Sequence, residues 1–144
     1  MANGEAFEIE LEVRDYECDL QGIVNNAVYQ HYLEHARHRF LRALGLDFAE
    51  LHERGADAVV HRVELDYRMP LRSGDRFIVR SSVRRQGIMR FVFEQEVLRL
   101  PDRDQAARGL VTAAFMSGGR PIRPPADVAA ALEGAGGRAP PLTS

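Results

Sequence analysis

Lysine is absent from this chain, and its absence excludes several kinds of chemistry. All 19 basic residues among the 144 are arginine. Schiff-base catalysis, the anchoring of pyridoxal phosphate and Walker-type phosphate binding each require a lysine amine. Sites of these three kinds are therefore excluded.

Cysteine is nearly absent, since Cys18 is the only one. A disulfide within the chain and a zinc site built from several cysteines are both impossible. Long apolar runs are missing too, because no stretch approaches the ~18 residues that a membrane span needs. The opening residues, MANGEAFEIE, lack the basic and then apolar pattern of a signal peptide. We expect a cytoplasmic protein that does not interact with membranes.

Charge of either sign is not in excess, because the formal net charge is −2. A nucleic-acid partner is therefore not expected. Hydrophobic residues make up 45% of the chain, enough for the core of one globular domain, which we place at residues 1–125. Residues 126–144 are rich in proline, glycine and alanine. We expect them to form a partly ordered, loosely held tail with at most a short helix at 126–133.

Alternating apolar and polar residues predict the strands. In residues 7–14, Phe7, Ile9, Leu11 and Val13 alternate with charged residues, which is the period of a half-buried strand. Further runs at 61–69, 76–85, 88–100 and 106–117 predict four more strands. Short turns join the last three, which favours an antiparallel meander.

Between the first two strands the pattern changes to the 3.6-residue period of a helix. This helix is expected to begin near Asn26, with Asn25 or Asn26 as its N-cap, and to end at Gly45. Its apolar side carries Tyr29, Leu33, Ala36, Phe40, Ala43 and Leu44, and its polar side carries His31, Glu34, His35, His38 and Arg42. A short second helix is expected at 47–53. The order predicts an α+β fold in which a curved antiparallel sheet of about five strands wraps around one long helix.

The loop before the long helix holds the candidate catalytic groups. Asp19 carries a carboxylate, which can attack a carbonyl carbon or activate water. Backbone N–H groups at the helix start, near Asn25 and Asn26, can stabilise negative charge on a carbonyl oxygen. Gly22 can let the loop approach a ligand closely. Each of these residues also has a purely structural interpretation, as a turn former, a helix cap or a bend.

Histidines on the polar side of the helix suggest a second kind of site. His31 and His35 fit an H-x-x-E-H zinc-peptidase pattern and would lie one helical turn apart. Such a site needs a third ligand and a substrate cleft. The alternative is a polar face that is solvated or forms a subunit contact. Cys18 is a further candidate nucleophile, and no G-x-S-x-G hydrolase motif occurs.

The segment RDYECDLQGIVNNAVYQHYLEHAR resembles the hotdog-fold thioesterases of the 4-hydroxybenzoyl-CoA thioesterase family. The family pattern is matched by Asp19, Gly22, Val24, the Asn25-Asn26 pair and Tyr29, and the resemblance extends over about residues 8–125. GDRFIVRSSV and GRPIRPP also look like family segments. The residues Val24-Asn25-Asn26 resemble those of the acyl-ACP and acyl-CoA branch of the family more than those of the hydroxybenzoyl enzyme.

The resemblance implies a hotdog fold and hydrolysis of an acyl thioester carried on coenzyme A or acyl carrier protein, in fatty acid or polyketide metabolism. It gives Asp19 the role of nucleophile or general base and assigns the polarising N–H to Asn26. Gly22, Val24, Asn25 and Tyr29 would contact the substrate, without a metal or other cofactor. It also implies a homodimer joined at the sheet edges, with the acyl channel along the interface, and commonly a homotetramer.

Three alternatives stay open at this point. A non-catalytic acyl-binding hotdog protein would keep the channel, a hotdog dehydratase would pair a histidine with a carboxylate, and a zinc hydrolase would use His31 and His35. Five arginines could grip the phosphates of the thiol carrier. They are Arg84, Arg85, Arg90, Arg120 and Arg123.

Overall fold

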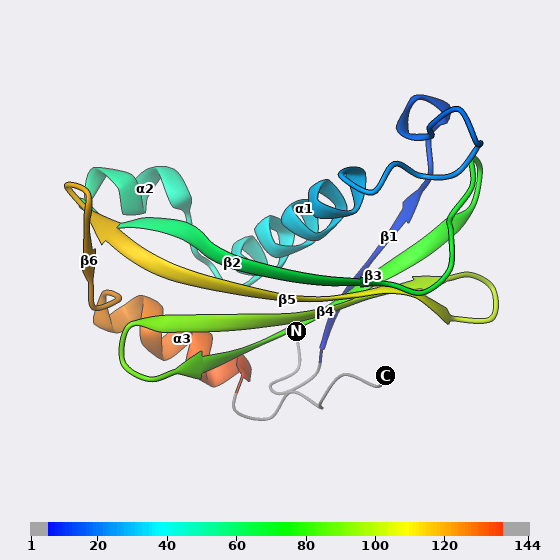
Figure 1. Cartoon of the computed structure of the whole chain (residues 1–144). Helices are drawn as coiled ribbons and strands as arrows, with labels where there is room; N and C mark the ends of the chain where they lie inside the picture. The colour runs from blue at the N-terminus through cyan, green and yellow to red at the C-terminus, as the bar shows by residue number, and fades with distance from the viewer. Residues whose placement is uncertain (1–5, 137–144) are drawn as a thin grey trace.

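The computed structural model describes residues 6–136 as one antiparallel sheet with helices against it (Figure 1). The strands are β1 (Phe7–Glu12), β2 (Asp57–Tyr67), β3 (Arg76–Gln86), β4 (Arg90–Arg99), β5 (Asp104–Ser117) and β6 (Arg120–Ile122). Their order is β1-β3-β4-β5-β2, with β6 paired to β5. The predicted α+β hotdog architecture is confirmed. The short strand β6 was not predicted, and it brings the sheet to six strands.

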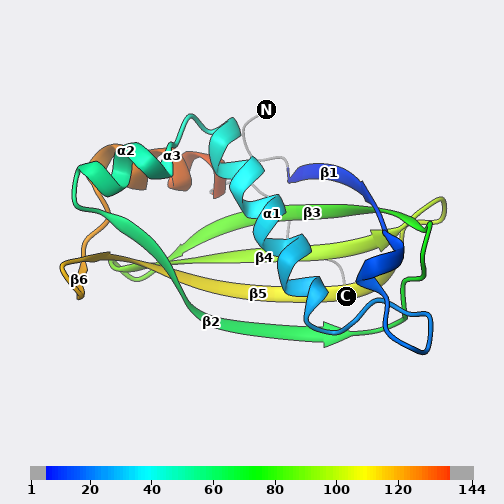
Figure 2. The same ribbon diagram turned by 90° about the horizontal axis from the view of Figure 1, so that it is seen from above.

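Helix α1 (Val28–Ala43) lies across the sheet, and Figure 2 shows the strands running beneath it. Tyr29, Leu33, Ala36 and Phe40 are buried as predicted. The buried side is wider than the sequence pattern indicates, because a sheet that curves around a helix covers more than one narrow face. It also includes Tyr32, Arg37 and Leu41, whereas Ala43 is exposed.

Strand β2 begins and ends earlier than the predicted run at 61–69. It extends from Asp57 to Tyr67, and its pairing with β5 shifts between Val60 and Arg62. Such an irregularity interrupts the alternation of apolar and polar residues along a strand. The first residues of β2 therefore do not continue the alternation from which the run at 61–69 was predicted. Met69 leaves the strand, and its N–H shares the Ala106 carbonyl with that of Arg68.

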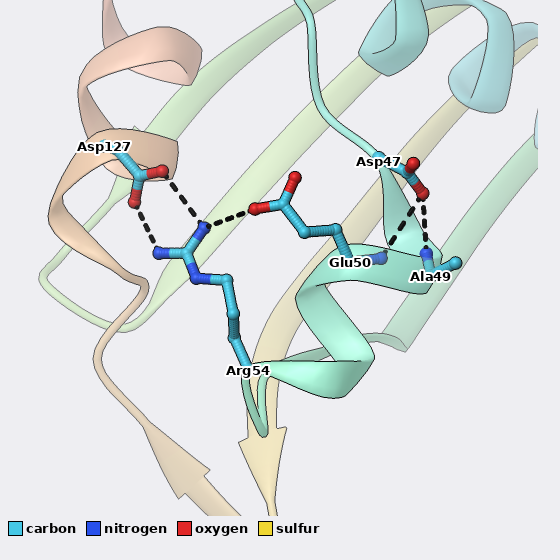
Figure 3. Close-up of polar contacts among 5 residues, drawn as sticks. All are labelled: Asp47, Ala49, Glu50, Arg54 and Asp127. Atoms are coloured by element: carbon cyan, nitrogen blue, oxygen red, sulfur yellow. Dashed lines mark hydrogen bonds and ion pairs between the residues drawn. The ribbon is translucent and has the colours of Figure 1, made fainter.

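Two further helices cover one end of the sheet. Helix α2 (Phe48–Glu53) matches the expectation for 47–53, and the Asp47 carboxylate caps it by accepting from the N–H groups of Ala49 and Glu50 (Figure 3). Helix α3 (Ala126–Gly136) packs on β3 and is longer than the predicted short helix.

The expectation of a loosely held segment is wrong for residues 126–136. Val128, Leu132 and Ala135 of α3 are buried, because their spacing places three apolar side chains on one helical face. The rest of the predicted tail, 137–144, lies outside the described residues.

Strand β2 is an edge of the sheet, and its side chains are largely exposed. Val59, Val60, Val63 and Tyr67 are between 36% and 47% exposed. A long edge strand with uncovered apolar side chains invites pairing with another strand. No helix among residues 6–136 has the length and apolar character to cross a membrane.

Candidate active site

The loop between β1 and α1 closes on itself like a small hairpin. Cys18 and Val24 form an antiparallel bridge, and the Asp19 N–H donates to the Ile23 carbonyl at 2.9 Å. The turn of this hairpin is closed by the Gly22 N–H, which donates to the Asp19 carbonyl at 3.0 Å. Gly22 has φ +79°, a conformation that side-chain-bearing residues rarely adopt.

Asp19 is exposed at the start of this turn. Its Oδ1 accepts from the Gln21 N–H at 2.8 Å, which is the local turn bond that a loop aspartate commonly makes. No hydrogen bond involves its Oδ2 among residues 6–136. One oxygen therefore orients the carboxylate, and the other is open to water or a ligand.

The two asparagines lie before the helix and do not cap it. The N-cap position is Ala27, which has a helical backbone conformation and no side-chain cap bond. Asn25 instead forms a turn, with its Oδ1 accepting from the Ala27 N–H at 2.9 Å. The expectation that Asn25 or Asn26 is the N-cap is thus wrong. The physical reason is that the Asn25 side chain accepts from the N–H two residues later and forms a turn there. The helix therefore begins only at Val28.

The Asn26 N–H belongs to the Asn25–Asn26 peptide, whose carbonyl accepts from the Val28 N–H at 2.9 Å. The next peptide is held by a residue that sequence reasoning missed, because the Tyr67 hydroxyl, at the end of β2, donates to the Asn26 carbonyl oxygen at 3.0 Å. In the described part of the chain, the Asn26 N–H has no hydrogen-bond acceptor. This exposed N–H can donate to a ligand oxygen without first breaking another bond.

Further contacts fix the loop to its surroundings. The Asn25 N–H donates to the Glu17 carbonyl at 3.0 Å, and the Val24 N–H donates to the Leu71 carbonyl at 2.9 Å. The Tyr32 hydroxyl of α1 donates to Glu17 Oε1 at 2.8 Å. Burial, together with the neighbouring Glu17 carboxylate, raises the pKa of Tyr32. Tyr32 therefore stays a hydrogen-bond donor. These bonds hold Asp19 and Asn26 as parts of one anchored loop.

The model of the thioesterase-like superfamily matches residues 13–132. The chain belongs to this superfamily. An acyl-acyl carrier protein thioesterase of Arabidopsis thaliana, described as chloroplastic, is 38% identical over 122 residues. The match covers 84% of this chain and 65% of the plant protein, so the chain spans less than two thirds of that relative's length.

Solved structures of similar sequence have the same fold. A hypothetical protein from Thermus thermophilus is 31% identical, with a TM-score of 0.80 over 87% of this chain and 95% of that chain. A thioesterase of the same species, complexed with coenzyme A and Zn, is 30% identical, with a TM-score of 0.77 over 91% and 95% of the two chains.

In this thioesterase-like chain, two of the residues expected to contact substrate belong to the core. Val24 is 2% exposed and Tyr29 is 3% exposed. The Tyr29 hydroxyl accepts from the Leu71 N–H at 3.3 Å, and its ring packs edge-on against Tyr67 with centroids 5.3 Å apart. Tyr29 therefore supports the tyrosine that holds Asn26. Contact of Val24 and Tyr29 with an acyl group stays a prediction.

The helix histidines of this superfamily member lie away from the Asp19 loop contacts. His31 and His35 are exposed on α1, and no cluster of three or more possible ligands from His, Cys, Asp and Glu occurs within residues 6–136. The His38 ring packs on Phe48 with centroids 5.2 Å apart, and burial lowers its pKa. His38 is thus an exposed residue of α1 whose ring contacts Phe48 of α2.

The candidate phosphate-binding arginines lie at the other end of the sheet. Arg84 pairs with Glu94 at 2.9 Å, and Arg85 pairs with Glu133 near the turn between β3 and β4. The Asp19 loop follows β1, whose last residue lies opposite Arg76 at the start of β3, so about 30 Å of strand separates the two ends. Arg72 is nearer, because its backbone bridges to Ile23 of the loop.

Proposed function

We propose that this protein hydrolyses acyl thioesters carried on coenzyme A or acyl carrier protein, releasing the free acid and the thiol. The observation that carries the proposal is the pairing, within one anchored loop, of an open Asp19 oxygen with the unengaged Asn26 N–H. Thioester hydrolysis needs both a nucleophile or base and a donor for the developing oxyanion.

In the proposed reaction, the thioester carbonyl oxygen accepts a hydrogen bond from the Asn26 N–H. The amino end of α1 adds favourable electrostatics for the negative charge that forms there. Asp19 Oδ2 then either attacks the carbonyl carbon or takes a proton from an attacking water. The tetrahedral intermediate collapses with loss of the thiolate, and in the first route water hydrolyses the resulting anhydride.

Two properties of the chain support this assignment. The plant relative that is 38% identical is named as an acyl-acyl carrier protein thioesterase. Arginine supplies all the cationic side chains, and a guanidinium holds phosphate oxygens well. Arg72, whose backbone bridges to Ile23 of the loop, is a candidate to meet the phosphates of a carrier.

A homodimer formed through β2 is part of the proposal. The edge strand is 11 residues long, and four of its apolar side chains are substantially exposed. Two copies related by a twofold axis would continue the sheet and cover these side chains. Association of two such dimers into a tetramer would leave this contact unchanged.

The test is thiol release from a panel of acyl-CoA and acyl-carrier substrates. Asp19→Asn keeps the shape of the side chain and its turn bond but removes the charge. We expect its kcat to fall by at least about a hundredfold. Asp102→Asn, an exposed turn residue, is the matched control and should retain full activity. Full activity of Asp19→Asn would overturn the assignment.

A single-turnover reaction in ¹⁸O-labelled water separates the two roles of Asp19. Label that enters the Asp19 side chain indicates nucleophilic attack, because hydrolysis of an anhydride at the enzyme carbonyl leaves one water oxygen in the carboxylate. Opening of the anhydride at the acyl carbonyl would also put the label in the released acid, so label found only there indicates a general base when hydroxylamine traps no acyl-Asp19 adduct. A wild-type chain that binds the whole panel but turns over none of it would instead favour an acyl-binding protein without catalysis.

A further inference from the structure

Glu17, two residues before Asp19, makes two separate contacts across the loop. Its backbone carbonyl accepts from the Asn25 N–H at 3.0 Å, which joins the residues that lead to Asp19 with those that lead into α1. Its side chain reaches the helix itself, because Oε1 accepts from the Tyr32 hydroxyl at 2.8 Å. One residue therefore contacts both the far arm of the loop and the helix that follows it.

Tyr32 offers this side chain a fixed point of attachment. It lies in the second turn of α1 and is 5% exposed. Its ring packs against Phe77 of β3, with centroids 4.7 Å apart, and against Tyr29, with centroids 6.0 Å apart. A phenol that is packed on two sides cannot follow a moving loop. The bond to Glu17 therefore restrains the loop relative to the helix.

The Glu17 oxygen that binds Tyr32 also serves the turn before Asp19. Oε1 accepts from the Arg14 N–H at 2.8 Å, across the short 3-10 helix Asp15–Glu17. Hydrogen bonds to an ionised carboxylate are stronger than those between neutral groups. Among residues 6–136, the Tyr32 hydroxyl has no second acceptor. Loss of the Glu17 carboxylate would leave this hydroxyl unpaired in a largely buried position, which is costly.

We propose that Glu17 is a positioning residue for the hydrolysis, which sets the Asp19 carboxylate against the Asn26 N–H by tying the loop to Tyr32. The inference rests on the proposed function for the reaction itself. It adds a residue that touches neither the substrate nor the reacting atoms. Rates fall steeply when a catalytic group is displaced by about 1 Å. The role depends on the acceptor oxygen of Glu17 and not on its charge.

The first test removes the bond from the helix side. Tyr32→Phe keeps the ring contacts with Phe77 and Tyr29. In the thiol-release assay we expect its kcat to fall by about tenfold, with a change in KM below about twofold. Tyr16→Phe is the matched control, because the Tyr16 hydroxyl lies in the same turn and accepts from Arg14 Nη1 at 2.6 Å. Equal kcat values for the two variants would overturn the inference.

Substitutions of Glu17 separate geometry from charge. Glu17→Gln keeps an acceptor oxygen for Tyr32 and Arg14, so kcat should stay within about twofold of the wild type, with an unchanged pH profile. Glu17→Ala removes the acceptor and should lower kcat by about tenfold. A loss in Glu17→Gln as large as that in Glu17→Ala would show that the charge matters and would overturn the geometric role.

A double substitution separates positioning from stability. Glu17→Ala leaves the Tyr32 hydroxyl unpaired, so its melting temperature should fall, and adding Tyr32→Phe should recover part of that loss. The kcat should not recover, because the tie is absent in both proteins, and the two effects on kcat should not add. Recovery of kcat together with the melting temperature would indicate a purely structural role and refute the inference.

Amide hydrogen exchange tests the tie without any turnover. The N–H groups of Asp19 and Asn25 donate within the loop, so their exchange rates report its opening. Tyr32→Phe should raise both rates by about fivefold, and Tyr16→Phe should leave them unchanged. Unchanged exchange in Tyr32→Phe would refute the positioning role even if hydrolysis is confirmed. Faster exchange, in a protein whose wild type turns over no thioester, would refute the proposed hydrolysis and confirm the tie to Tyr32.

Discussion

At the scale of single residues, Tyr67 holds the Asn26–Ala27 peptide, which directly follows the proposed N–H donor. Removing the Tyr67 hydroxyl by Tyr67→Phe keeps the ring against Tyr29 but frees the Asn26 carbonyl. We expect kcat on a good acyl-CoA substrate to fall by about tenfold, because the backbone next to the donor is then held less firmly. KM and the melting temperature should change little, since Tyr67 is 47% exposed. A parallel loss of stability would indicate a purely structural role.

Glycine is required at position 22 because of its backbone conformation, and not because a side chain would lack space. A Cβ at this position would meet nothing within 4 Å, but φ is +79°. Gly22→Ala should therefore lower the free energy of unfolding by about 1 kcal/mol through backbone strain alone. Gly134→Ala, in α3 with equally open space and no positive φ, is the control and should raise it slightly. Urea denaturation of the two variants measures the difference, and equal effects would contradict this account.

At the scale of elements, the ion pair that links Arg54, at the end of α2, to Asp127 in α3 should respond to acid. The Arg54 guanidinium lowers the pKa of Asp127 below its ordinary value of 3.8. A carboxylate whose pKa is lower in the folded state stabilises the fold above its unfolded pKa, and this contribution is lost as pH falls through the folded value. Asp127→Asn should therefore melt below the wild type at neutral pH. The gap should close in acid below about pH 4.

The same link joins the two helices that cover one end of the sheet. Both partners of the ion pair are exposed, so its effect on stability is small and is screened by salt. Asp66→Asn, on the outer side of β2, serves as the control for removing one exposed carboxylate. A gap of the same size and pH dependence in Asp66→Asn would show that the response is not specific to the link.

At the scale of the whole molecule, we expect the edge strand β2 to govern assembly. Val63 is 36% exposed near the middle of this strand, and a charge there would be buried if two chains joined. Val63→Glu should convert the expected dimer to a monomer in light scattering coupled to gel filtration. Ile88→Glu, at a turn with a 54% exposed side chain, is the control and should remain dimeric. A wild-type monomer would refute the proposed interface.

Much of the element pattern could be predicted from the sequence. Period two in residues 7–14 and period 3.6 after Asn26 correspond to β1 and α1, because one face of each is buried against a single core. Gly45 and Gly55 have φ near +80°, as helix-terminating glycines do. The pattern failed at the start of β2, where the pairing with β5 is irregular, and in α3, where a sequence rich in alanine and glycine obscured the buried face.

The sequence by itself determined which groups are available for chemistry. It excludes lysine-dependent sites and places a carboxylate, a flexible glycine and two asparagines in one short loop. It also determined the order of strands and helices, since hydrophobic periodicity is a local property of the chain. Asp19, Gly22 and Asn26 are candidate site residues in the sequence, and their roles stay predictions.

Only the tertiary structure decided how these groups are held. Tyr67 is 41 residues from Asn26 in sequence, and Asp127 is 73 from Arg54. Such contacts form when distant segments pack around a common core, and no local pattern of polar and apolar residues encodes which side chains will meet there.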